Sequence, residues 1–177
     1  FDYILIYKSI TLTDNGIFSR DTLITLRDII KGKRPNDFEL TEIQELALKN
    51  AFLKGNCIFD ENTPAFIISN EKCITAAINR DINSVDYIND PNQELIEKIL
   101  KLAPTQGYVL KRTSPDYLRM DYNVALNSIK YDVNSANYII WKDKSEEQKN
   151  SLVNEIINRG YLLSTGSSRW IKINPDI

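Results

Sequence analysis

An eight-residue block that occurs twice constrains this sequence more than any other feature. Residues 81–88 read Asp-Ile-Asn-Ser-Val-Asp-Tyr-Ile, and residues 132–139 read Asp-Val-Asn-Ser-Ala-Asn-Tyr-Ile. Five of the eight positions are identical, and the match extends without a gap back to Pro64 and Pro115. Self-similarity at a fixed period of this length is typical of a repeat architecture.

A second, weaker pair divides each half again. Gly107-Tyr108-Val109-Leu110 corresponds to Gly160-Tyr161-Leu162-Leu163 at almost the same spacing, with the two-residue difference absorbed near Trp141. The sequence therefore predicts four related units, at about residues 69–89, 92–112, 121–141 and 145–165.

Each unit begins with apolar residues at helical spacing. In the first unit, residues 73, 74, 77 and 78 are all apolar and form a stripe with a period of 3.6. Asn92, Asp121 and Ser145 are suited to cap the first helices of the later units. The second part of a unit, as in residues 83–88, predicts a short helix capped by Asn83 or Ser84.

Short helices of this kind bury their apolar faces only against neighbouring units. We therefore predict a mainly α fold in which four stacked helix-turn-helix units form a short α-solenoid over residues 61–165. Residues 166–177 are left as a C-terminal tail.

Residues 77–88 also carry a family resemblance. They read Ala-Ile-Asn-Arg-Asp-Ile-Asn-Ser-Val-Asp-Tyr-Ile, and residues 128–139 keep most of this pattern. The pattern resembles tandem short α-helical repeats of unknown function found in viral, protist and bacterial proteins. The second and fourth units depart from it, with Pro104 and Gly160 inside the motif. The resemblance implies a scaffold and transfers no catalytic residue.

The first sixty residues contain no copy of the unit. Residues 1–7 are aromatic and β-branched, which is typical of a strand or of the start of a buried helix. Residues 19–31 predict one helix. Thr41 and Gln44 form a capping box that predicts a second, ending at Gly55. Its expected core face is Ile43, Leu46, Ala47 and Phe52. We expect residues 1–60 to cap the repeats or to form a small domain, with one or two short strands allowed.

Composition narrows the chemistry. The chain has 177 residues, a net charge of −2 and no histidine, which excludes a Ser-His-Asp relay and an imidazole acid or base. The two cysteines, Cys57 and Cys73, are too few for a four-cysteine zinc site, and we expect two buried thiols. No apolar run is long enough to span a bilayer. No N-glycosylation sequon occurs, which favours an intracellular protein. We expect no cofactor and no metal.

The repeated Asp81 and Asp132 are the first suspects for paired carboxylates. Both precede the short helix of their unit, so capping of that helix is the favoured interpretation over catalysis. The recurring aromatic residues either pack between units or anchor a partner. These interface candidates are Tyr87, Tyr108, Tyr138, Trp141 and Tyr161.

Two basic groups offer a weaker alternative. A solvated surface is the default explanation for both, and binding of an acidic partner, a phosphate or a nucleic acid is the functional one. The overall acidity argues against a nucleic-acid binder. The groups are Lys31, Lys33 and Arg34, and Lys111 with Arg112.

The sequence thus favours a non-enzymatic helical-repeat protein that binds another protein, such as a phage or viral factor acting on a host protein. The rival is a small enzyme or toxin that uses Asp, Glu, Tyr, Lys, Arg or Cys in the first sixty residues or in the loop at 163–170. The third alternative is an RNA or DNA binder that uses the basic groups.

Overall fold

The computed structural model describes residues 42–54, 57–61 and 63–161, and every regular element in these ranges is helical. The chain forms two compact units, Phe1–Asp90 and Pro91–Ile177. The mainly α fold class is therefore confirmed for the described residues. The expected domain boundary at residues 60–64 differs from this division, because α3, before it, packs against α5, after it, in the same unit.

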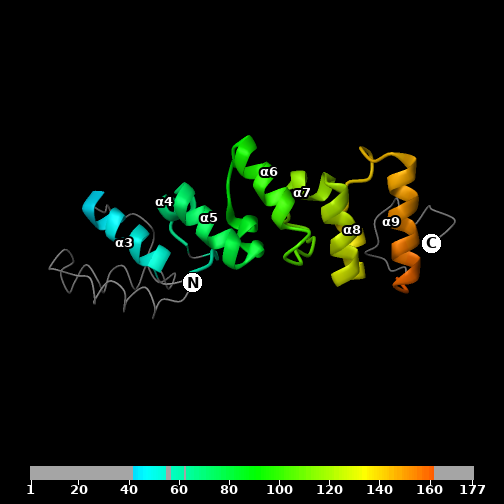
Figure 1. The fold of residues 1–177 in the computed structure, drawn as a ribbon, viewed down its shortest axis with the longest axis horizontal. Coiled ribbons are helices and arrows are strands. Elements are labelled where there is room, and N and C mark those ends of the chain that lie inside the picture. The colour runs from blue at the N-terminus through cyan, green and yellow to red at the C-terminus, as the bar shows by residue number, and fades with distance from the viewer. Residues whose placement is uncertain (1–41, 55–56, 62, 162–177) are drawn as a thin grey trace. The chain divides into compact units, whose positions relative to one another are not determined.

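In the first unit, α3 (Glu42–Lys54), α4 (Ala65–Ile68) and α5 (Glu71–Arg80) precede a 3₁₀ helix, η1 (Ile82–Tyr87) (Figure 1). The core contains Phe52, Phe59 and Ile78, all almost fully buried. Arg80, at the end of α5, donates hydrogen bonds to the carbonyl oxygens of Leu53, 3.3 Å away, and Cys57, 3.2 Å away. The guanidinium of Arg80 therefore supplies donors to carbonyl groups at and just after the end of α3. Carbonyl groups at a helix end have no amide partner within the helix.

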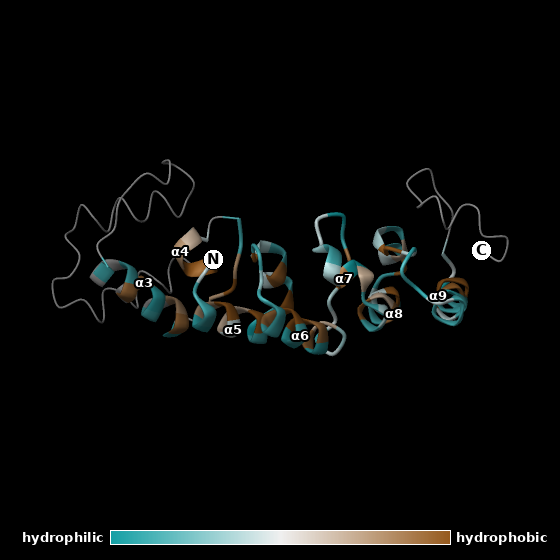
Figure 2. Ribbon diagram, turned by 90° about the horizontal axis from the view of Figure 1, so that it is seen from above, coloured by the Kyte–Doolittle hydropathy of each residue, from teal (hydrophilic) through white to brown (hydrophobic). Residues whose placement is uncertain are grey.

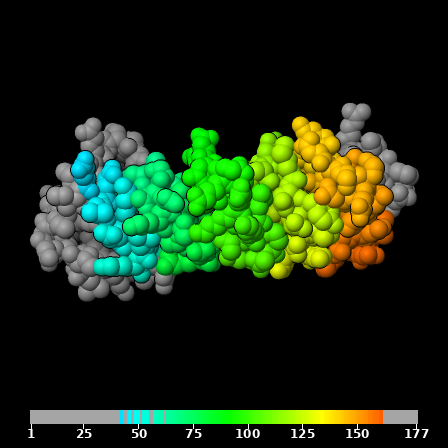
Figure 3. Space-filling view, turned by 45° about the horizontal axis from the view of Figure 1, so that its top comes forward, coloured from blue at the N-terminus to red at the C-terminus, as the bar shows by residue number. Residues whose placement is uncertain are grey.

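The second unit contains α6 (Gln93–Leu102), α7 (Asp116–Met120), α8 (Tyr122–Tyr131), the 3₁₀ helix η2 (Val133–Tyr138) and α9 (Glu146–Asn158). Helices α8 and α9 run parallel, because Tyr122, the first residue of α8, bonds to Ser151 in the first half of α9, and Arg159, after the end of α9, bonds to the carbonyl of Lys130 near the end of α8. Figure 2 shows apolar residues gathered on one side of α9. In the space-filling view of Figure 3, the side chains of α8 and α9 meet along the length of both helices.

The residues that begin the helices are the ones that physical chemistry favours. The side chain of Asn92 accepts a hydrogen bond from the Leu95 amide, and that of Asp121 accepts one from the Val124 amide. Ser145 and Gln148 form a capping box at the start of α9. These three predicted caps are confirmed, and Asn70 caps α5 in the same way.

The two copies of the eight-residue block have the same hydrogen bonds. The Asp81 carboxylate accepts from the Asn83 amide at 2.9 Å, and the Asp132 carboxylate accepts from the Asn134 amide at 2.9 Å. Each Asp also has an extended backbone, with φ values of −143° and −145°. The capping interpretation of both aspartates is therefore confirmed. The expectation that Asn83 or Ser84 is the cap is wrong, since Asp81 occupies that position.

The weaker glycine–tyrosine pair is also matched in structure. Gly107 and Gly160 have φ values of +73° and +67°, a region that favours glycine. The amide of Tyr108 donates to the Ala103 carbonyl, and the amide of Tyr161 donates to the Ile156 carbonyl. In both cases the amide bonds to a carbonyl five residues earlier, across the end of the helix, which a glycine in the left-handed conformation permits.

Two details differ from the sequence-based expectations, and a third lies outside the described residues. Helices α4 and α7 were not predicted, and each begins after a proline, Pro64 or Pro115. The second unit has turns and extended chain instead of a second helix at residues 103–111. The second part of the fourth unit, after residue 161, lies outside the described residues.

The predicted helix after Thr41 exists as α3, but its expected core face is partly wrong. Leu46 is 59% exposed, whereas Leu48 and Phe52 are buried. A sequence with apolar residues on several sides does not define one face by periodicity alone. The expected strand or helix at residues 1–7, the helix at 19–31, Thr41 of the capping box and the tail at 166–177 lie outside the described residues. The side chains of Ile43, Gln44 and Ala47 also lie outside what the structure describes.

Candidate interaction surface

Three of the five aromatic interface candidates are core residues. Tyr108 is 1% exposed, Trp141 is 6% exposed and Tyr161 is 9% exposed. The Tyr108 hydroxyl donates to Ser114 Oγ at 2.7 Å, and the Tyr161 hydroxyl lies 2.6 Å from Asn137 Oδ1. Their interpretation as surface anchors is therefore wrong, because these side chains are already covered by the rest of the unit.

The other two aromatic candidates remain accessible. Tyr87, in η1, is 37% exposed, and Tyr138, in η2, is half-buried. They occupy the same position in the two copies of the block. Arg119 fixes the backbone around Tyr138, since its Nε donates to the Tyr138 carbonyl and its own carbonyl accepts from the Ile140 amide.

The basic candidates fall in different places. Lys111 and Arg112 are exposed in the turn before α7, and the Lys111 amide donates to Ser114 Oγ. Lys31, Lys33 and Arg34 lie outside the described residues. Only the second basic group can therefore be placed.

The most exposed large aromatic side chain among the described residues is Tyr131, the last residue of α8. It is 61% exposed, yet one part of its ring lies against the backbone of Gly107. A Cβ atom at Gly107 would lie only 3.1 Å from the Tyr131 Cζ atom. The ring is thus supported from one side and open to solvent on the other, which is the state of a preformed contact residue.

Tyr131 lies where the ends of three helices of the second unit carry basic residues. Lys101 is in the last turn of α6 and Lys130 in the last turn of α8, and Arg159 caps α9. Figure 1 shows α6, α8 and α9 ending on the same side of this unit. We call the part of this region that printed contacts connect the Tyr131 surface, and define it as Gly107, Lys130, Tyr131 and Arg159.

The charged groups around Tyr131 are of both signs. The side-chain ammonium group of Lys130 forms no hydrogen bond or ion pair with a described residue. The guanidinium of Arg159 pairs with Glu155 at 2.9 Å and donates to the Lys130 carbonyl. Asp132, next to Tyr131 in the chain, has a carboxylate that accepts hydrogen bonds from the uncharged N–H groups of Asn134.

One further lysine, Lys144, is buried and belongs to the core. Its ammonium donates to the carbonyl of Met120 at the end of α7. Burial lowers the pKa of Lys144 below its usual value, and the nearby Asp121 and Asp143 partly oppose that effect. Lys144 therefore stabilises the junction of α7 and α8 and is not available to a partner.

No three Cys, Asp or Glu residues in the described ranges lie together in a way that could hold a metal ion. Cys57 and Cys73 are buried thiols, as expected, and burial raises the pKa of Cys73 to about 11, which suppresses the reactive thiolate. In the described part of the chain, no helix has the length and hydrophobicity to cross a membrane.

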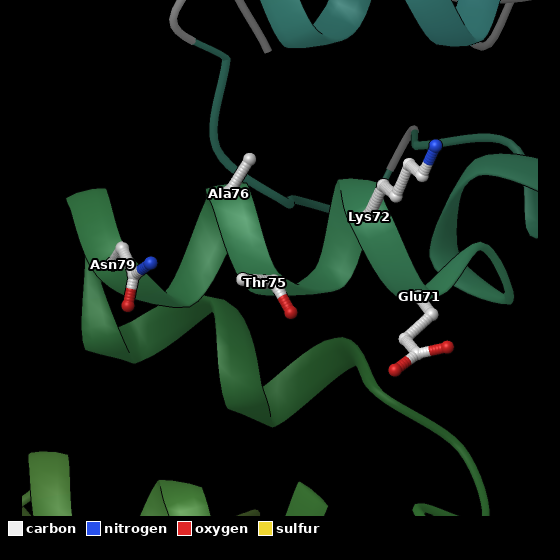
Figure 4. A pocket seen from close by; sticks show the side chains of 5 residues that line it. All are labelled: Glu71, Lys72, Thr75, Ala76 and Asn79. Atoms are coloured by element: carbon white, nitrogen blue, oxygen red, sulfur yellow. The ribbon is translucent and has the colours of Figure 1, made fainter.

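A hollow of about 500 Å³ lies along α5, but its chemistry is that of an exposed helix face. Its described lining residues all come from that one helix, and Figure 4 shows their polar ends pointing to different sides. A ligand site needs polar groups that converge, and these do not. The lining residues are Glu71, Lys72, Thr75, Ala76 and Asn79.

Comparison with known proteins adds no relative: no family model matches the chain, and no curated protein and no solved structure is significantly similar to it. The family resemblance of residues 77–88 therefore stays a prediction.

Sequence reasoning missed Tyr131. The available signal was its position in the repeat. Tyr131 aligns with Arg80 in the other copy and does not belong to the apolar stripe of its helix. An aromatic residue at a position that is charged in the other copy indicates exposure.

Proposed function

We propose that this chain is a non-enzymatic helical-repeat protein that binds another protein through the Tyr131 surface. The observation that carries the proposal is the 61% exposed ring of Tyr131, which lies on the backbone of Gly107 and needs little ordering on binding. Aromatic and arginine side chains are the residues that most often dominate binding energy at protein interfaces.

The proposal includes a short solenoid of related helical units. The matched caps at Asp81 and Asp132 and the matched helix ends at Gly107 and Gly160 support it. In such proteins successive units stack, and the exposed residues of several helices form one binding face. The ends of α6, α8 and α9 supply that face here.

The rival enzyme proposal has less support, because the polar side chains that line the hollow along α5 do not converge. The nucleic-acid alternative has the exposed pair Lys111 and Arg112 in its favour, against an overall net charge of −2.

Site-specific photocrosslinking tests the proposal. Tyr131 is replaced by p-benzoylphenylalanine, and the matched control carries the same group at Asn154, an exposed position on the middle of α9. In a lysate of the native host, we expect a discrete protein adduct from position 131 and none from position 154. Equal labelling at both positions, or none at 131, would refute binding through the Tyr131 surface.

A further inference from the structure

The only Asp–Pro bond in the sequence lies at the boundary between the two compact units. The first unit ends at Asp90 and the second begins at Pro91. The aligned position in the other copy of the repeat is Trp141, which is buried and accepts a hydrogen bond from the Lys144 amide at its carbonyl. The Asp–Pro bond is therefore a feature of the boundary and not of the repeat.

The backbone of Asp90 is strained. Its φ of +47° lies in the left-handed region, and among the described residues other than glycine only Asp90 has a positive φ. A proline also crowds the residue before it and favours an extended backbone there. Asp90 therefore adopts a conformation that its own Cβ and the following ring both oppose, and strain of this kind is concentrated at functional positions.

The side chain of Asp90 is exposed, and its carboxylate has no hydrogen bond or ion pair within the described part of the chain. The carboxylates of Asp81, Asp121 and Asp132 differ, because each accepts a hydrogen bond from an amide two or three residues later. Those three carboxylates are held by capping, whereas that of Asp90 is free to reach its own main-chain carbonyl. Attack within one residue proceeds at a high effective concentration, since the two groups are already joined.

From these observations we propose that the Asp90–Pro91 bond is a self-cleavage site that acts in acidic solution. The proline nitrogen takes a proton from the solvent, and a carboxylate oxygen of Asp90 attacks the main-chain carbonyl carbon of the same residue. The carbon–nitrogen bond breaks, so that Pro91 leaves as a secondary amine and Asp90 becomes a cyclic anhydride. Water then opens the anhydride to two carboxyl groups. The net reaction is hydrolysis of one peptide bond by one water molecule.

This inference does not depend on the proposed function. Cleavage would break the covalent connection between the first unit and the second unit, which carries the Tyr131 surface. The products are the chains 1–90 and 91–177, which are the two compact units.

Intact-mass spectrometry of the full chain tests the proposal. The protein is incubated at about pH 4, with a second sample at about pH 7 as the control. We expect the fragments 1–90 and 91–177 to accumulate at the lower pH and the chain to stay intact at the higher one. An intact chain at both pH values, or breakage at other bonds first, would overturn the proposal.

Three variants identify the attacking group. Asp90→Ala removes the carboxylate and should abolish the cleavage. Asp90→Glu keeps the charge but lengthens the side chain, which should slow the cleavage about tenfold or more. Glu94→Ala, the matched control, removes an exposed carboxylate in the first turn of α6 and should leave the rate unchanged. Circular dichroism checks that all three fold, and cleavage of Asp90→Ala at the original rate would refute the mechanism.

A comparison with the unfolded chain separates the contribution of the fold from that of the dipeptide. In about 8 M urea the Asp–Pro sequence is kept, but the left-handed backbone of Asp90 is lost. Because bond breakage relieves the strain, the folded chain should be cleaved about tenfold faster than the unfolded chain at the same pH. An equal or faster rate in urea would show that the fold does not promote the reaction, and the self-cleavage site would be refuted.

Discussion

The ring of Tyr131 and the backbone of Gly107 form a contact that leaves little room for a side chain at position 107. Gly107 has a φ of +73°, and an added Cβ would meet three ring atoms of Tyr131 at 3.1–3.4 Å. Gly160, the matching glycine, has a similar φ of +67°, but a Cβ added there would meet no atom within 4 Å. Substitution of Gly160 therefore tests backbone strain alone, whereas substitution of Gly107 tests backbone strain together with crowding against the Tyr131 ring.

Gly160→Ala should lower the free energy of unfolding by about 1–2 kcal/mol, the usual cost of a left-handed conformation for an L residue. Gly107→Ala should cost about 1 kcal/mol more, because the Tyr131 ring must also move. Chemical denaturation of both variants measures the difference. In the double variant Gly107→Ala with Tyr131→Ala, the added cost should disappear. Equal costs for the two glycines would contradict the contact.

The aspartates of the repeated block should contribute similar amounts to stability. Asp81→Ala and Asp132→Ala each remove an acceptor for two N–H groups of the asparagine two residues later. Each should lower the free energy of unfolding by about 1 kcal/mol. Asp81→Asn keeps a side-chain oxygen acceptor and should lose less. If alanine at both positions leaves the unfolding midpoint unchanged, the capping role is wrong.

The two buried serines of the block should differ, although they occupy equivalent positions. Ser84 Oγ accepts a hydrogen bond from the Phe59 amide at 3.1 Å, whereas the buried Ser135 Oγ has no partner in the described part of the chain. Ser84→Ala should therefore cost about 1–3 kcal/mol, because it leaves the Phe59 amide without its acceptor. Ser135→Ala should be neutral or stabilising, because it removes an unsatisfied hydroxyl. Thermal denaturation of both variants is the measurement, and a larger loss at Ser135 would contradict the assignment.

The buried Lys144 predicts a pH dependence with a defined sign. Its pKa in the folded protein is below the ordinary value of 10.5, so between these two pKa values the unfolded chain binds more protons. The free energy of unfolding should therefore rise relative to a Lys144→Met variant as the pH increases toward 10.5. Urea titrations of both proteins from about pH 7 to about pH 10 measure this difference, because other groups titrate equally in both. A constant difference would show that Lys144 keeps an ordinary pKa, and a falling one would show a raised pKa; both results contradict the lowered pKa.

The repeat and its capping residues were readable from the sequence for a simple reason. A side chain such as Asp121 or Ser145 bonds to an amide three residues later, so the interaction is local. The same holds for Asp81 and Asp132 and for the glycines that follow α6 and α9. Helices α4 and α7 were missed because they have only four and five residues, too few to show a hydrophobic period.

The surface was less predictable than the helices. Tyr108, Tyr131 and Tyr161 are the same residue type, but the first and third are buried and the second is exposed. Tyr108 and Tyr161 follow a glycine that turns the chain back onto its own helix, and their hydroxyl groups find partners at Ser114 and Asn137. Ser114 and Asn137 lie outside α6 and α9, so the burial of the two tyrosine rings depends on how these segments pack against the helices.

The sequence by itself determined the mainly helical fold, the starts of α6, α8 and α9 and the local turns of the repeated block, because these depend on contacts between residues close in the chain. Only the tertiary structure decided which aromatic rings are buried, why equivalent serines differ, and that the exposed ring of Tyr131 lies against Gly107. Those outcomes depend on the packing of helices that are distant in sequence, where a single neighbour such as Gly107 decides how a side chain is supported.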